Sequence, residues 1–90
     1  MKILTEITYE ENEKIQMLIE KKNALKNLIE LLHSQKGHES LLTSAEKEYQ
    51  EICKLYDGWW DAVIQRYQFQ QYDTTRLIVD CEKRIICYTF

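Results

Sequence analysis

Residues 42–63, LTSAEKEYQEICKLYDGWWDAV, decide the fold of this 90-residue chain. Apolar side chains recur along this stretch at alternating steps of three and four, which is the spacing of one face of an α-helix. The positions on this face, called the seam below, are Leu42, Ala45, Tyr49, Ile52, Tyr56, Trp59 and Val63. The spacing runs without interruption through Asp57-Gly58, a dipeptide that is otherwise typical of hairpin turns. The pattern therefore predicts one continuous helix over about 41–70, with Gly58 inside it.

An earlier helix is predicted over about 9–35. Thr8 and Glu11 have the spacing of a capping box, in which each residue satisfies a backbone N–H of the other at the start of a helix. The apolar face of this helix comprises Ile15, Leu18, Leu25, Ile29 and Leu32, with Lys22 among them, and Ile19, Ala24, Leu28 and Leu31 widen it. Gly37 suits a left-handed cap at the end of the helix.

The second helix has two candidate starting points. It begins at Ser40, or at Thr43, which forms another capping-box pattern with Glu46. In either case a short connection around Gly37 separates the two helices, so we expect them to form an antiparallel hairpin.

The C-terminal stretch RLIVDCEKRIICYTF, residues 76–90, is rich in β-branched and aromatic residues and predicts a β-hairpin. A three-residue loop would pair Val79 with Ile85, and a two-residue loop would shift the register by one. An isolated hairpin is barely stable in water, so it must pack on the helices or add its edge to a second copy. The expected fold is mainly α: a single domain, 1–90, with an antiparallel two-helix hairpin and a short C-terminal β-hairpin, dimerising into a helical bundle.

Composition narrows the class of protein. A net charge of −3 argues against a chain whose main partner is nucleic acid. No stretch approaches the roughly 20 apolar residues of a membrane span, and the start lacks the apolar core of a signal peptide. We therefore expect a cytoplasmic protein without a membrane partner, whose three cysteines are reduced thiols.

The cysteines and histidines do not predict a metal or redox site. In neither hairpin register does Cys81 face Cys87, and the spacing of Cys53 from them is not that of a zinc site. His33 and His38 straddle the predicted turn and lack the helical spacing of paired ligands. We predict no metal site, no cofactor and no catalytic residue, and keep a small thiol- or metal-dependent enzyme only as the weaker alternative.

Two carboxylates flank the tryptophans. Asp57 and Asp61 are four residues apart and so share one face of the predicted helix. Near aromatic surface they would raise each other's pKa or bind a cation; as solvated side chains they would simply keep this face of the helix soluble.

Trp60 points about 100° away from Trp59 on a helix, so the two rings cannot share one narrow seam. Trp59 continues the seam, whereas Trp60 belongs to the core, to a dimer interface or to a partner contact. Tryptophan, tyrosine and arginine dominate many interfaces. The predicted interface residues are Trp60, Arg66, Tyr67, Phe69 and Tyr72.

The chain resembles the small bacterial accessory proteins of the CXXX repeat peptide modification system. The resemblance lies in TEITYEENEKIQMLIEKKNALKNLIELL (5–32), in WWDAVIQRYQF (59–69) and in the strand-rich end. Such proteins are encoded beside a radical-SAM maturase and a precursor peptide with recurring cysteines. The resemblance implies a non-catalytic accessory protein of ribosomal-peptide (RiPP) maturation that binds the precursor or the maturase, and it transfers no catalytic residues. The alternative is a purely structural, self-associating helical oligomer.

Overall fold

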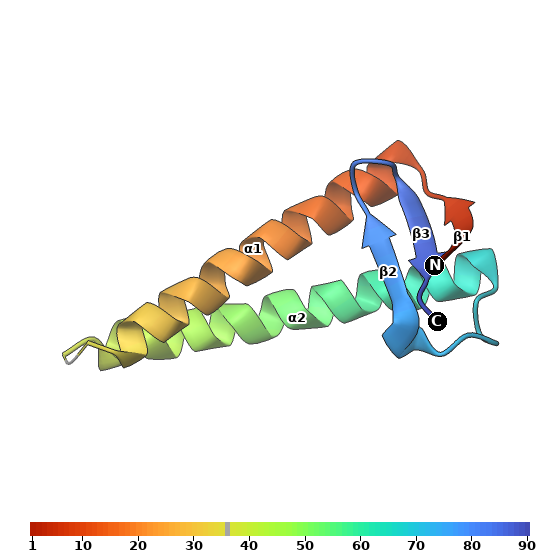
Figure 1. The fold of residues 1–90 in the computed structure, drawn as a ribbon. Helices are drawn as coiled ribbons and strands as arrows, with labels where there is room; N and C mark the ends of the chain where they lie inside the picture. The colour runs from red at the N-terminus through yellow and green to blue at the C-terminus, as the bar shows by residue number, and fades with distance from the viewer. Residues whose placement is uncertain (36) are drawn as a thin grey trace.

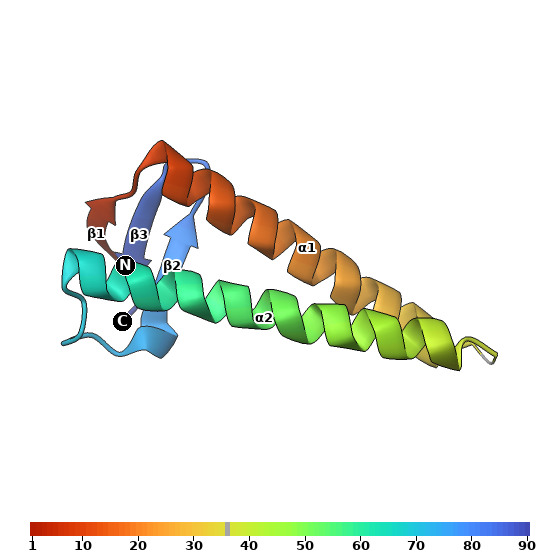
Figure 2. The same cartoon turned by 180° about the vertical axis from the view of Figure 1, so that it is seen from behind.

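The computed structural model describes residues 1–35 and 37–90 and is mainly helical. Its elements, in chain order, are β1 (Lys2–Glu6), α1 (Tyr9–His33), α2 (Glu39–Tyr67), a short 3-10 helix η1 (Thr74–Arg76), β2 (Leu77–Asp80) and β3 (Ile85–Tyr88). The two helices form an antiparallel hairpin, and the sheet lies across the end of the hairpin where α1 begins and α2 ends (Figure 1). Seen from behind, α2 passes in front of the strands (Figure 2). The predicted helical hairpin is confirmed.

The capping box at the start of α1 forms as predicted. Thr8 Oγ1 accepts a hydrogen bond from the Glu11 N–H at 3.1 Å, and Glu11 Oε1 accepts one from the Thr8 N–H at 2.8 Å. At the other end the helix stops at His33, two residues earlier than expected, with Ser34 as the cap. Gly37 does adopt a left-handed conformation, with φ +90°, but three residues beyond that cap.

The start of α2 differs from both predicted positions. The helix begins at Glu39 with His38 as N-cap, one residue before the first candidate, Ser40. Thr43 is not a cap, because it lies in the second turn of the helix, where its hydroxyl donates to the Glu39 carbonyl oxygen at 2.9 Å. The backbone N–H of a residue inside a helix is already hydrogen-bonded within the helix. Glu46, three residues after Thr43, therefore has no unpaired N–H of Thr43 to accept from.

Gly58 lies inside α2, which continues unbroken to Tyr67 and ends at the left-handed residue Gln68. The prediction of one continuous helix is confirmed, although it ends three residues before position 70. A Cβ at Gly58 would meet nothing within 4 Å. No close neighbour among residues 1–35 and 37–90 therefore requires the glycine.

The sheet has three strands rather than the two of the predicted hairpin. The strand order is β1-β3-β2, all antiparallel, so the N-terminal strand β1 adds to the hairpin and makes β3 the central strand. In the hairpin Val79 pairs with Ile86 and Ile78 with Cys87, which is the one-residue shift that the two-residue loop alternative gives. The connection itself is wider, running from Cys81 to Arg84, where Arg84 adopts φ 54°.

The core lies where the sheet crosses the helices. It comprises Ile7, Ile15, Leu18, Ile52, Trp59, Val63, Phe69, Leu77 and Ile86. From the seam, Ala45, Ile52, Trp59 and Val63 are buried, whereas Leu42, Tyr49 and Tyr56 are half-buried. On α1, three of the four residues that were expected to widen the apolar face, Ala24, Leu28 and Leu31, are exposed, whereas Ile19 is half-buried and packs against the core. Far from the sheet, each helix has only the other helix to cover it.

Candidate functional site

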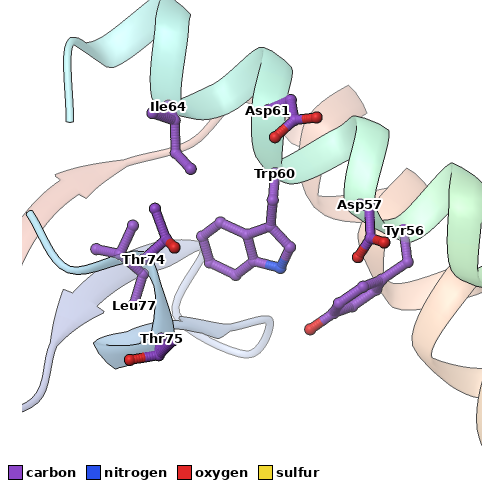
Figure 3. A pocket seen from close by; sticks show the side chains of 8 residues that line it. All are labelled: Tyr56, Asp57, Trp60, Asp61, Ile64, Thr74, Thr75 and Leu77. Atoms are coloured by element: carbon purple, nitrogen blue, oxygen red, sulfur yellow. The ribbon is translucent and has the colours of Figure 1, made fainter. Parts of the chain in front are cut away.

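The two tryptophans diverge as helical geometry requires. Their rings meet edge to face, with centroids 5.0 Å apart and planes at 89°. Trp59 is buried in the core, and its Nε1–H donates to the Glu11 carbonyl oxygen at 3.1 Å. Trp60 is half-buried and points away from α2 toward η1 and the start of β2 (Figure 3). Of the two rings, only Trp60 is in a position to meet a ligand.

Trp60 forms one wall of a pocket between α2 and the segment that leads into β2. The pocket has a volume of about 350 Å³. Its lining residues are Tyr56, Asp57, Trp60, Asp61 and Ile64 from α2, and Thr74, Thr75 and Leu77 from η1 and β2 (Figure 3). One side of the pocket is therefore aromatic and acidic, and the other carries two hydroxyl groups.

Both carboxylates of this pocket lack a side-chain partner among the residues that the structure describes. In the described part of the chain, neither Asp57 nor Asp61 belongs to any ion pair or side-chain hydrogen bond. In Figure 3 the nitrogen-bearing edge of Trp60 faces Tyr56 and Asp57. Lys22, which does not line this pocket, places its Nζ 4.2 Å from the centroid of the Tyr56 ring. An aromatic face beside unpaired carboxylates fits a positively charged group such as a lysine or arginine side chain.

Arg66 and Tyr67, two of the predicted interface residues, bind α1 of the same chain. The Tyr67 hydroxyl donates to Glu11 Oε1 at 2.6 Å, and Arg66 Nη1 lies 3.3 Å from Glu11 Oε2. Burial alone would raise the pKa of Glu11, but the hydrogen bonds from Tyr67 and Thr8 and the charge of Arg66 outweigh it and lower that pKa. This carboxylate therefore joins the start of α1 to the end of α2.

The Glu11 contacts predict a pH-dependent contribution to stability. We expect Glu11→Gln to lower the free energy of unfolding by about 1–2 kcal/mol at pH 7, because it removes the negative charge from a side chain that accepts hydrogen bonds from three donors. A lowered pKa in the folded state means that this contribution is present above the unfolded value of about 4.3 and is lost as the pH falls below it. Urea unfolding of both proteins between pH 7 and pH 3 measures the difference.

Glu10→Gln is the matched control, since Glu10 lies in the same helical turn and is exposed. It should change stability by less than about 0.5 kcal/mol at every pH. A Glu11→Gln deficit that stays constant down to pH 3 would contradict the role assigned to the Glu11 charge.

Phe69 and Tyr72, the remaining predicted interface residues, belong to an aromatic row that leads to the sheet. Phe69 is buried, stacks on Tyr67 with centroids 5.9 Å apart, and meets Tyr72 edge to face at 5.8 Å. Tyr72 in turn lies 5.0 Å from Tyr88 of β3. Of the predicted interface set, Trp60 alone lines the pocket. Sequence reasoning missed Thr74, Thr75 and Leu77, whose approach to Trp60 depends on how the chain turns back after α2.

The thiols and histidines lie apart from the pocket. Cys53, Cys81 and Cys87 are all free, and Cys87 faces Ile78 across the hairpin. Burial, and to a lesser extent nearby carboxylates, raises the pKa of Cys81, which disfavours a reactive thiolate. Among residues 1–35 and 37–90, no group of three or more His, Cys, Asp or Glu side chains is arranged to hold a metal ion.

Comparison with known proteins gives no relative: no family model, curated protein or solved structure matches the chain. Neither helix, as far as the structure describes them, combines the length and the apolar character that crossing a membrane requires.

Proposed function

We propose that this chain is a non-catalytic accessory protein that binds a peptide or protein partner at the Trp60 pocket. The observation that carries the proposal is the pocket itself, in which a half-buried tryptophan stands beside two unpaired carboxylates, Asp57 and Asp61. Tryptophans in such settings contribute a large share of interface energy, because they bury a large flat surface with little loss of side-chain freedom.

The resemblance in sequence suggests where such binding would be used. It supports a role in a bacterial ribosomal-peptide modification system, with the precursor peptide or the radical-SAM maturase as the partner. Both would be met in the cytoplasm, which is the location we propose. In this role the chain presents or holds a partner, and the maturase carries out the chemistry.

Calorimetry with a precursor peptide and a radical-SAM maturase of such a modification system tests the proposal. We expect one of them to bind at micromolar concentration, and Trp60→Ala to weaken that binding by about 30-fold or more, as loss of a central interface tryptophan does. Leu55→Ala is the matched control, because Leu55 is a large exposed residue of the same helix outside the pocket. Absence of binding to either partner, or equal effects of the two substitutions, would contradict the proposal.

A second candidate, self-association, is favoured by the outer face of the sheet, which we define as Ile3, Ile78, Ile85 and Cys87. Side chains alternate between the faces of a strand, and these four lie opposite the core residues Leu77 and Ile86. Ile85 and Cys87 are already buried within the chain, outside the main core cluster, so the open part of this face is Ile3, which is 64% exposed, and Ile78, which is 38% exposed. A strand that is apolar on both faces, as Ile85-Ile86-Cys87-Tyr88 is, usually has both faces covered. A second copy of the chain would cover the outer face.

Light scattering coupled to size-exclusion chromatography tests this candidate. If a second copy covers the outer face, the protein elutes as a dimer at about 100 µM, and Ile78→Lys makes it a monomer by burying a charge in the interface. The control is Leu41→Lys, an exposed position on α2 far from the sheet that should leave the dimer intact. A wild-type monomer at this concentration rules out the outer face as a stable interface.

A further inference from the structure

β2 is an edge strand with unpaired backbone groups. The Thr89 N–H donates to the Arg76 carbonyl oxygen at 2.9 Å, which fixes the alternation of hydrogen bonds along the pair β2–β3. By that alternation Ile78 and Asp80 bond to β3, and the backbone groups of Leu77 and Val79 point to the free edge. The Leu77 N–H already donates a hydrogen bond to the Thr74 carbonyl oxygen. The free edge therefore offers the Leu77 carbonyl and both backbone groups of Val79.

The other edge of the sheet is less suited to pairing. In β1 the register shifts between Ile3 and Thr5, which marks a bulge, and the strand carries the exposed charges of Lys2 and Glu6. Bulges and charges are devices by which sheet edges avoid pairing with other chains. The pairing of β2 with β3 is regular over Leu77–Asp80, and no bulge interrupts it. Of the two edges, β2 is the one that is open to another strand.

The free edge of β2 adjoins the Trp60 pocket. Leu77 is both the first residue of β2 and part of the pocket wall, and Thr74 and Thr75 precede it. In Figure 1 α2 crosses behind β2, and Figure 3 places the Trp60 ring between α2 and this segment. A strand added to β2 would therefore pass over the pocket.

We propose that an extended segment of the partner adds to β2 as a fourth strand and places a lysine or arginine side chain in the Trp60 pocket. The inference rests on the proposed function and names the partner's chemistry. The free groups of Leu77 and Val79 bind the backbone of the segment, as in other cases of strand addition. Trp60 and the carboxylates of Asp57 and Asp61 select the basic side chain by cation–π and charge attraction.

Three synthetic peptides with blocked ends provide the test. The first is a heptapeptide of alternating threonine and valine with a central arginine, the second replaces that arginine with glutamine, and the third is the arginine peptide with alternate amides N-methylated. Each is titrated into the ¹⁵N-labelled full chain. We expect the arginine peptide to shift the amide signals of Ile78 and Val79 and the indole signal of Trp60, with a Kd of about 0.1–1 mM.

The control peptides separate the two parts of the proposal. The glutamine peptide should bind about tenfold more weakly, because it lacks the charge. The N-methylated peptide should not bind, because it lacks the donors that pair with β2. In the double variant Asp57→Asn/Asp61→Asn the preference for the arginine peptide over the glutamine peptide should shrink, because only the cation–π contact with Trp60 remains to favour the charge. Val79→Pro removes a donor that β3 does not use and should abolish binding of both peptides.

Several outcomes overturn the proposal. Equal binding of the arginine and glutamine peptides to the wild type excludes the basic side chain, and binding of the N-methylated peptide excludes strand addition. No signal change at about 1 mM excludes both. If the wild-type chain is a dimer and Val79→Pro dissociates it, then the β2 edge pairs with a second copy of the chain and not with a partner segment. If Trp60→Ala weakens binding of the natural partner, but Val79→Pro and the loss of the two carboxylates do not, the inference fails while the proposed function stands.

Discussion

Replacing Trp59 with alanine is expected to lower the free energy of unfolding by about 3–5 kcal/mol, the usual range for deleting a buried aromatic ring. Trp59 is 6% exposed and packs in the core that joins both helices to the sheet. Its indole N–H also holds the Glu11 carbonyl at the start of α1, and that carbonyl would be left without this donor. For a domain of 90 residues, a loss of this size removes much of the total stability.

The adjacent residue is the matched comparison. Trp60→Ala should cost roughly 1–2 kcal/mol, because this ring is half-buried and one side of it faces the pocket. Trp59→Phe should fall between the two, since it keeps a ring and loses the hydrogen bond. Urea unfolding followed by circular dichroism measures all three variants. Equal losses at Trp59 and Trp60 would contradict the division between a core tryptophan and a pocket tryptophan.

Asn12→Asp is expected to lower the free energy of unfolding by about 2–4 kcal/mol at pH 7. Asn12 is buried at 7% exposure, and its Nδ2 donates to the Cys81 carbonyl oxygen at 3.0 Å. Its Oδ1 is buried and has no hydrogen-bond partner among the described residues. Aspartate has the same shape, but it would place a charged acceptor against that carbonyl and against no compensating donor.

The pH dependence distinguishes a buried charge from a simple loss of packing. A carboxyl group at position 12 would have a raised pKa in the folded state, so its cost is full well above that value and disappears as the pH falls toward the unfolded value of about 3.9. The difference between Asn12→Asp and the wild type should therefore shrink between pH 7 and pH 4. Asn23→Asp, at an exposed position of the same helix, is the control. A deficit that does not change with pH would show that charge burial is not its cause.

Much of the helical part of the fold could be predicted from local sequence. The apolar spacing of three and four along α2 continues through Asp57-Gly58, and the helix is continuous there as well. Burial of Ile52, Trp59 and Val63 outweighs the loss of helix stability that one glycine causes. The capping box at Thr8 was readable because both of its partners lie within four residues. The start of α2 could not be read in this way. Threonine is a common N-cap residue, but the Thr43 hydroxyl bonds to the Glu39 carbonyl oxygen from inside the helix.

The sheet and the pocket depend on contacts between distant segments. β1 lies more than 70 residues from its partner β3 in sequence, and Lys2–Glu6 is too short and too mixed in character to predict a strand alone. The sequence could show that Asp57 and Asp61 share a face with each other. It could not show that η1 and β2 return to Trp60, because no local pattern encodes that approach.

The two indole signals of the ¹⁵N spectrum test the central claim most directly, since the chain contains two tryptophans. The measurement is a titration of the ¹⁵N-labelled chain with the partner that binds it in calorimetry, with the indole signals assigned from Trp60→Phe. If the Trp60 pocket is the binding site, the Trp60 indole signal shifts strongly and in proportion to occupancy, and the Trp59 signal shifts much less. A complex that forms without moving the Trp60 signal, or that moves only the Trp59 signal, would contradict it.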